Sequence, residues 1–117
     1  MGYLTTHVLD TAQGRPGQDI KIEVIRINGS ERQVIKSVTT NDDGRCDSPI
    51  LEGDDFVTGE YELVFHAGDY LRAQGFKADE PRFLDVIPLR FGVSDASEHY
   101  HVPLLVSPYS YSTYRGS

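Results

Sequence analysis

Two of the four histidines, His99 and His101, are separated by a single residue near the end of the chain. In an extended strand such a pair projects from one face, and each imidazole can take up or release a proton because its ordinary pKa is near 6.5. The same pair could bind zinc, with His7 as a third ligand. Three histidines spread along the chain are weak support for a metal site, so we favour surface or hydrogen-bonded histidines. We predict no metal and no cofactor.

Arg45, Cys46 and Ser117 are the other side chains whose types suit chemistry. Arg45 directly follows a turn signal, and by itself it would be interpreted as a solvated cation. Cys46 has no cysteine or histidine motif around it, so we interpret it as a small core residue rather than a nucleophile. Ser117 lies outside any Gly-x-Ser-x-Gly pattern, so its spacing predicts no hydrolase triad. Spacing alone therefore leaves the function open.

These residues belong to a chain of 117 residues with a formal charge of −7 and one cysteine. The length is typical of one domain, and we predict a single domain over residues 1–117. The negative charge argues against a nucleic-acid partner, and no apolar run approaches the roughly 20 residues that cross a membrane. The lone cysteine and the lack of a signal-peptide pattern predict a cytoplasmic protein. A peroxisomal location in a eukaryote stays open.

The elements that must position the candidates are short and mostly extended. Alternating apolar residues, β-branched runs and turn signals predict strands at residues 4–9, 20–27, 31–40, 61–66, 83–93, 99–106 and 109–114, with an ambiguous edge segment at 48–59. In the first of these strands Thr5 and His7 share one face, opposite to Leu4. Pro88 indicates that its strand lies at a sheet edge or carries a bulge.

Residues 69–75 form the only predicted helix, with Asp69 as its N-cap and Gly75 as its C-terminal stop. A helix of barely two turns must be held by packing rather than by intrinsic propensity. Seven or eight short strands with turn signals at intervals of about 8–12 residues predict an all-β protein, an antiparallel β-sandwich.

Three sequence blocks together resemble the transthyretin-like family and, within it, the 5-hydroxyisourate hydrolase branch. The first block, Leu4–Pro16, reads LTTHVLDTAQGRP, and the second, Thr40–Cys46, reads TNDDGRC. The third runs from His99 to the closing Tyr-Arg-Gly-Ser, which is the signature of the enzyme branch. The blocks occur in the family's order and reach from residue 4 to residue 117.

The resemblance implies a transthyretin-like sandwich of two four-stranded sheets with one short helix. It also implies a homotetramer, a dimer of dimers, with active sites in a channel between the dimers. The implied reaction is hydrolysis of 5-hydroxyisourate to 2-oxo-4-hydroxy-4-carboxy-5-ureidoimidazoline in urate catabolism. The residues that fall on the family's catalytic positions are His7, Arg45, His101 and Ser117. Those implied to bind the substrate are His7, Arg45, Tyr114 and Arg115, whereas the role of His99 is open.

A small-molecule carrier of the transthyretin type is the alternative, because that branch shares the segment Ser107–Thr113. The carrier has Lys, Glu and Thr where this chain has His7, Arg45 and His101, and its tail is longer. Each difference places an acid–base or anion-binding group here, which favours an enzyme. We therefore expect water, activated and oriented by His7 and His101, to attack a lactam carbonyl. Ser117 would hold or relay a proton, and Arg45 would stabilise the developing charge.

Overall fold

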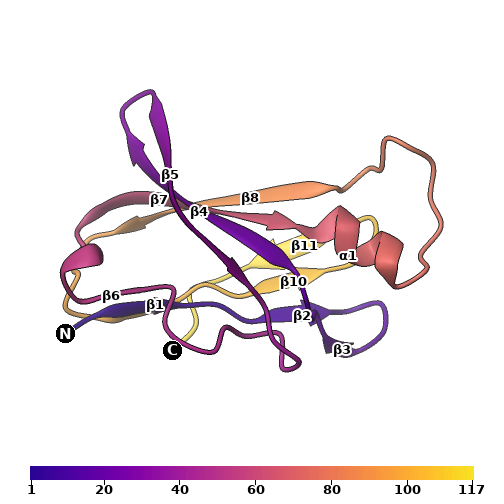
Figure 1. Ribbon diagram of the computed structural model, residues 1–117, viewed down its shortest axis with the longest axis horizontal. Helices are drawn as coiled ribbons and strands as arrows, with labels where there is room; N and C mark the ends of the chain where they lie inside the picture. Colours follow the sequence, from indigo (N-terminus) through magenta and orange to yellow (C-terminus); the bar gives the residue numbers. More distant parts are fainter.

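The computed structural model describes all 117 residues, which form two packed β layers and one short α-helix (Figure 1). The first layer is a fully antiparallel sheet in the order β5-β4-β7-β8. Its strands are β4 (Lys21–Asn28), β5 (Glu31–Thr39), β7 (Gly59–His66) and β8 (Val86–Val93). The predicted Asn28-Gly29 hairpin is confirmed between β4 and β5, and Pro88 lies on the edge strand β8, as predicted.

The second layer consists of two shorter sheets that continue each other, in the orders β6-β1-β9 and β11-β10-β2-β3. Its strands are β1 (Tyr3–Thr5), β2 (Val8–Asp10), β3 (Arg15–Pro16), β6 (Leu51–Glu52), β9 (His99–His101), β10 (Leu104–Val106) and β11 (Tyr111–Thr113). β1 pairs with β9 and β2 with β10, and both pairs are parallel. The predicted β-sandwich is confirmed, with these two parallel pairs inside a mostly antiparallel fold.

The strands predicted at residues 4–9 and 99–106 are each interrupted, and the two breaks lie side by side. Pro103 lies between β9 and β10, and proline has no amide hydrogen to donate to a ladder. The neighbouring amides still pair across the gap, since Val102 donates to the carbonyl of Thr5 over 2.9 Å. Leu104 donates to the carbonyl of His7, also over 2.9 Å. His7 therefore lies at a break in the sheet without any loss of register.

The core lies between the two layers as one cluster of 21 buried apolar residues. Leu63 and Phe65 of β7 meet Leu4 of β1 and Leu104 of β10 in this cluster, and all four side chains are fully buried. Burial of such side chains contributes most of the stability of a domain of this size. None of the helices is long and apolar enough to cross a membrane.

The helix α1 spans Ala67–Ala73, so it begins two residues before the predicted N-cap. His66 occupies the N-cap position and makes no side-chain capping bond, so the assignment of Asp69 was wrong. Gly75 has a φ of 83° just past the helix, which confirms the predicted stop. Packing holds the helix, because the Tyr70 hydroxyl donates to the buried carboxylate of Asp10 over 2.7 Å.

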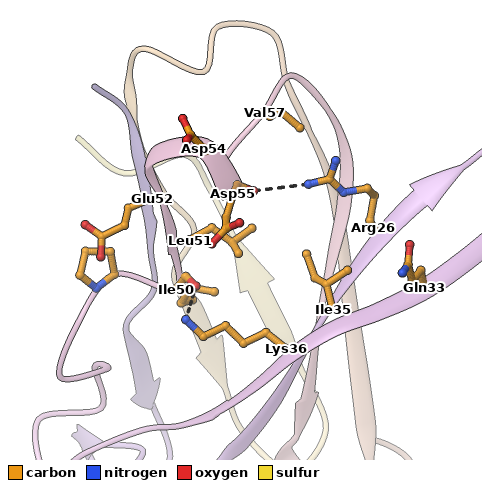
Figure 2. Close-up of a pocket in the computed structure, with 11 residues that line it drawn as sticks. Arg26, Gln33, Ile35, Lys36, Ile50, Leu51, Glu52, Asp54, Asp55 and Val57 are labelled. Atoms are coloured by element: carbon orange, nitrogen blue, oxygen red, sulfur yellow. Dashed lines mark hydrogen bonds between the residues drawn. The ribbon is translucent and has the colours of Figure 1, made fainter.

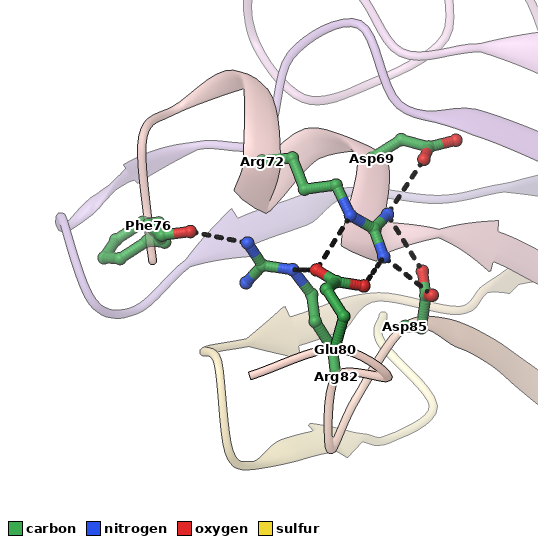
Figure 3. A network of polar contacts seen from close by, with 6 residues as sticks. All are labelled: Asp69, Arg72, Phe76, Glu80, Arg82 and Asp85. Carbon is green, nitrogen blue, oxygen red and sulfur yellow. Dashed lines mark hydrogen bonds and ion pairs between the residues drawn. The ribbon is translucent and has the colours of Figure 1, made fainter. Parts of the chain in front are cut away.

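The loop of residues 76–85 is fastened to the helix by a network of charges (Figure 3). The guanidinium of Arg72 lies 2.9 Å from carboxylate oxygens of both Glu80 and Asp85. Arg82, whose side chain is only 5% exposed, donates to the carbonyl of Phe76 over 2.5 Å. These contacts hold the chain against α1, so the strand predicted from residue 83 begins only at Val86.

Candidate active site

Most of the predicted catalytic side chains open onto one cavity of about 380 Å³ beside the second layer. Its wall includes Thr5, Arg45, His99, His101 and Ser117. These residues come from three distant parts of the chain: the first strand, the turn before Cys46, and the terminal segment. The fold thus brings together the three sequence blocks that carried the resemblance.

The parallel pairing of β1 with β9 arranges the histidines. Tyr3 lies opposite His99 and Thr5 opposite His101, so the alternation of each strand puts all four side chains on one face. The hydroxyl oxygen of Thr5 lies 2.7 Å from Nε2 of His99 and 2.8 Å from Nδ1 of His101. The ring of His99 also stacks on Tyr3, with centroids 4.1 Å apart. The histidine pair is therefore hydrogen-bonded, which is the alternative that we favoured over a metal site.

A tight turn presents Arg45 to the cavity. The side-chain oxygen of Asn41 accepts hydrogen bonds from the amides of Asp43 and Arg45, at 2.9 and 3.1 Å. Gly44 has a φ of 75°, and its carbonyl accepts the amide of Val8 over 2.8 Å. A Cβ at Gly44 would lie 2.5 Å from the carbonyl oxygen of Val8, so only glycine lets the turn dock this closely.

The guanidinium of Arg45 is exposed and forms no ion pair with the carboxylates of the chain. Arg32, Arg72 and Arg90 differ from it, since each is paired with acidic side chains. An arginine that faces a cavity without a carboxylate partner keeps its hydrogen-bond donors available for a ligand. Arg45 therefore suits an anionic or carbonyl-bearing ligand.

The end of the chain closes the cavity through a bridge between Gly116 and His101. The amide of Gly116 donates to the carbonyl of His101 over 2.8 Å, as in an antiparallel pair. A Cβ on Gly116 would lie 2.4 Å from Cδ2 of the His101 ring. The glycine of the closing tetrapeptide thus allows the tail to pass directly over the imidazole, which brings Ser117 to the wall of the cavity.

His7 and His101 are both half-buried and both have shifted acidities. Burial lowers the pKa of His7, the positive charge of Arg45 lowers it further, and contacts with Asp43 partly oppose these effects. Burial likewise lowers the pKa of His101, followed by the charges of Arg45 and of the other two histidines. Both effects favour the neutral ring, which is the form that accepts a proton.

Tyr114 and Arg115 lie elsewhere in the isolated chain. They line a second, mostly apolar cavity of about 230 Å³ beside β8 and β11. The guanidinium of Arg115 lies 3.9 Å from the ring centroid of Tyr100 and donates to the carbonyl of His99 over 3.3 Å. Their role in substrate binding stays a prediction.

Cys46 is half-buried: it lines the first cavity and packs against the edge of the core rather than inside it. Burial raises the pKa of its thiol, and the negative charge of Asp47 adds to the effect. The reactive thiolate is therefore disfavoured.

The largest cavity, about 510 Å³, contains none of the predicted residues (Figure 2). It lies between β5 and the segment around β6, where Lys36 donates to the carbonyl of Ile50 over 2.9 Å. Arg26 points across it toward the carbonyl of Asp55 at 3.4 Å. No histidine lines this cavity.

Thr5 is the residue that sequence reasoning missed. Its place on the face of His7 was predicted, but its contact with two histidines depends on a parallel pairing between the two ends of the chain. The alternation of side chains along a strand predicts which residues share a face. It does not predict which other strand pairs with that strand.

The fold is a β-sandwich, and its cavity holds histidines beside an arginine that has no carboxylate partner. The chain belongs to the HIUase/Transthyretin family, whose model matches residues 4–116. The predicted family is thereby confirmed.

The chain is similar to named enzymes over its whole length. It is 62% identical over 116 residues to 5-hydroxyisourate hydrolase 2 of Rhizobium meliloti (strain 1021), which covers 99% of this chain and 97% of that protein. The structure of Klebsiella pneumoniae 5-hydroxyisourate hydrolase superposes with a TM-score of 0.81 at 26% identity, covering 100% of both chains. The structure of (S)-allantoin synthase superposes with a TM-score of 0.93 at 46% identity, covering 99% of this chain but only 44% of that one.

Proposed function

We propose that this chain hydrolyses 5-hydroxyisourate to 2-oxo-4-hydroxy-4-carboxy-5-ureidoimidazoline in urate catabolism. The observation that carries the proposal is the single cavity in which Arg45, His101 and Ser117 meet. The high identity to a relative named as this hydrolase supports the same substrate. A transthyretin-type carrier would have no use for neutral imidazoles beside an unpaired guanidinium.

The proposed reaction begins with the substrate bound to Arg45. The guanidinium binds a carbonyl or anionic edge of the planar purine derivative, and its local positive charge attracts an anion to a protein of net charge −7. A neutral imidazole, His7 or His101, takes a proton from water as the water oxygen attacks the lactam carbonyl.

The tetrahedral oxyanion that forms is stabilised by Arg45. When it collapses, the carbon–nitrogen bond of the lactam breaks and the imidazolium returns its proton to the leaving nitrogen. Ser117 holds or relays a proton at the edge of the cavity. The carboxyl group and the amine-derived group that result contain all the atoms of the substrate and the water.

One experiment tests this function against its alternatives. Hydroxyisourate is generated from urate with uricase, the protein is added, and the decay of the ultraviolet absorbance is followed with and without a chelator. We expect faster decay than the spontaneous reaction and no effect of the chelator. Decay at the spontaneous rate would leave a carrier, and activity that the chelator removes would show a metal-dependent enzyme.

A matched pair of variants ties the activity to the cavity. Arg45→Gln removes the unpaired guanidinium, and we expect a loss of about 100-fold to 1,000-fold in kcat. Arg26→Gln removes an arginine that lines the largest cavity instead, and we expect it to retain normal turnover. Equal losses in both variants would show that the assignment of the site is wrong.

The proposed enzyme is one domain over residues 1–117 that assembles as a homotetramer, a dimer of dimers, in the cytoplasm. Unpaired sheet edges support an assembly, since β8 and β11 are both edge strands. Val86 and Tyr111 on these strands are 49% and 45% exposed, and Tyr114 just beyond β11 is 60% exposed. Exposed edges with large apolar side chains are typical of surfaces that pair with another chain.

A further inference from the structure

We propose that the Thr5 hydroxyl couples His99 to His101 in a proton relay, which makes Thr5 a positioning residue for the hydrolysis. The inference rests on the proposed function and deepens it, because it assigns a direction to the proton movements of His101. Its basis is the pair of short hydrogen bonds that one hydroxyl makes to two different imidazoles, at 2.7 and 2.8 Å.

The single hydrogen of the Thr5 hydroxyl ties the two rings together. The hydroxyl can donate to only one ring nitrogen at a time, so it must accept a hydrogen from the other. When Nδ1 of His101 carries a hydrogen and donates to Thr5, Thr5 donates to a bare Nε2 of His99. In the opposite state Nε2 of His99 carries the hydrogen, and Thr5 donates to a bare Nδ1 of His101. The tautomer of one ring therefore fixes that of the other.

The orientation of His101 connects this choice to the cavity. Its Nδ1 faces Thr5, and its Cδ2 lies on the side of Gly116 at the closing tail. Nε2 is bonded to Cδ2 and makes no hydrogen bond to Thr5, so it is the ring nitrogen left to serve the cavity that His101 lines together with Ser117 and Arg45. In the first state Nε2 is bare and is a base, whereas in the second state it carries a hydrogen and is an acid.

The relay supplies the base and then the acid that hydrolysis needs. Nε2 of His101 takes a proton from the attacking water, Nδ1 passes its hydrogen to the Thr5 oxygen, and the Thr5 hydrogen moves to Nε2 of His99. His101 is then neutral with a hydrogen on Nε2, and His99 carries the positive charge. When the lactam bond breaks, Nε2 of His101 gives its proton to the leaving nitrogen and the relay runs back. No proton is gained or lost over the cycle.

Arg45 and Tyr3 lie beside different rings of the histidine pair. The charge of Arg45 disfavours an imidazolium at His101. The ring of His99 lies flat on Tyr3, at 4.1 Å and an angle of 12°, and an aromatic face attracts a cation. The ring centroids of His99 and His101 are 6.1 Å apart, so the relay moves the positive charge over this distance, toward Tyr3.

Two substitutions at Thr5 test the relay. Thr5→Val keeps the shape but removes the hydroxyl, and we expect kcat to fall about 10-fold to 100-fold. Thr5→Ser keeps the hydroxyl and should retain at least half of the wild-type kcat. Thr11→Val is the matched control, because that hydroxyl donates to the carbonyl of Val106 and touches no histidine. Its kcat should be unchanged.

A double-mutant cycle separates a relay from two independent contributions. His99→Gln can still hydrogen-bond Thr5 but cannot carry a proton, so we expect a loss similar to that of Thr5→Val. If the residues act as one unit, the double variant will be no slower than the slower single variant. Losses that multiply in the double variant, or normal turnover in Thr5→Val, would overturn the relay.

A spectroscopic measurement of the histidine tautomers tests the relay independently of hydrolase activity. The ¹⁵N chemical shifts of labelled imidazoles report which nitrogen carries the hydrogen, with or without turnover. Replacing Thr5 by Val should change the tautomers of both His99 and His101, and replacing Thr11 by Val should change neither. Unchanged shifts would overturn the relay, whereas a wild-type protein without hydrolase activity would overturn only the proposed function.

Discussion

Arg45 lines the cavity with its hydrogen-bond donors, and its positive charge also acts on the pKa values of two imidazoles. Its guanidinium adds to burial in lowering the pKa values of His7 and His101. A histidine with a lowered pKa stays neutral, and so remains a base, at pH values where an ordinary histidine is already protonated. The same residue that suits an anionic ligand therefore also favours the neutral form of both histidines.

The pH dependence of kcat/KM measures this effect. We propose that the neutral histidines are the active form. Activity should then be lost only as the pH falls through their lowered pKa values, so the midpoint of the acidic limb should lie below about 6.5. Arg45→Gln removes the positive charge, raises both pKa values and should shift this limb to higher pH. An acidic limb that stays at the wild-type pH in this variant would contradict the argument, and Arg26→Gln serves as the control with an unchanged profile.

At the scale of elements, two segments without regular structure position the site. The turn of residues 41–45 docks on β2 through Gly44, and the tail docks on β9 through Gly116. In each case a missing side chain allows a close approach, to the Val8 carbonyl in one and to the His101 ring in the other. The two glycines thus determine how Arg45 and Ser117 meet.

Gly44→Ala should destabilise the turn. A Cβ there meets the Val8 carbonyl at 2.5 Å, and the φ of 75° adds backbone strain, so we expect a loss of about 1–3 kcal/mol in the free energy of unfolding together with reduced turnover. Gly29→Ala is the control, since its φ of 60° is similar but nothing lies within 4 Å of the added carbon. Chemical denaturation of both variants measures the difference. Equal losses would mean that the close approach at Gly44 is unimportant.

Gly116→Ala should impair turnover far more than stability. The added carbon would displace the His101 ring or lift the tail, but residues 111–115 are exposed and contribute little to the core. We expect kcat to fall about 10-fold or more and the denaturation midpoint to be nearly unchanged. Deleting Arg115–Ser117 should abolish turnover in a folded protein. Normal turnover after the deletion would show that the tail is only structural, and Gly92→Ala, which has open space around it, is the control.

At the scale of the whole molecule, the two layers leave strands β8 and β11 unpaired on one side each. The isolated chain also leaves Tyr114 and Arg115 beside these edges rather than in the histidine cavity. An assembly through such edges would cover their free backbone groups. The predicted tetramer and the predicted role of these two residues are therefore connected, since both depend on what covers this region.

Light scattering after size exclusion tests the assembly. We expect a mass of four times the 13.1 kDa chain, because the exposed edges and tyrosines have a partner only in a larger assembly. Dilution should lower the apparent mass first to that of a dimer if the tetramer is a dimer of dimers. A monomer at all concentrations would contradict the tetramer, and the activity measured on the same fractions would show whether the site needs a second copy.

Much of the fold could be predicted from the order of residue types. Alternation predicted that β4 and β7 are strands, and Asn28-Gly29 predicted the hairpin between β4 and β5. Alternation did not predict that both faces of β7 are buried, with Glu62 and Val64 only 5% and 7% exposed. The N-cap at Asp69 and the strand start at Phe83 were wrong. The helix begins before Asp69, at Ala67. The ion pairs of Arg72 with Glu80 and Asp85 hold the segment before Val86 against the helix, so the strand cannot begin at Phe83.

The sequence by itself determined the family, the sandwich, and the identity of the residues that could do chemistry, because these depend on which residue types occur and in what order. Only the tertiary structure decided how they meet. It placed Arg45 without a carboxylate partner, put Tyr114 and Arg115 beside another cavity, and set Thr5 between His99 and His101. The reason is that these contacts join residues that are separated in the sequence, and the pairing of distant strands is fixed by the packing of the whole core rather than by local sequence.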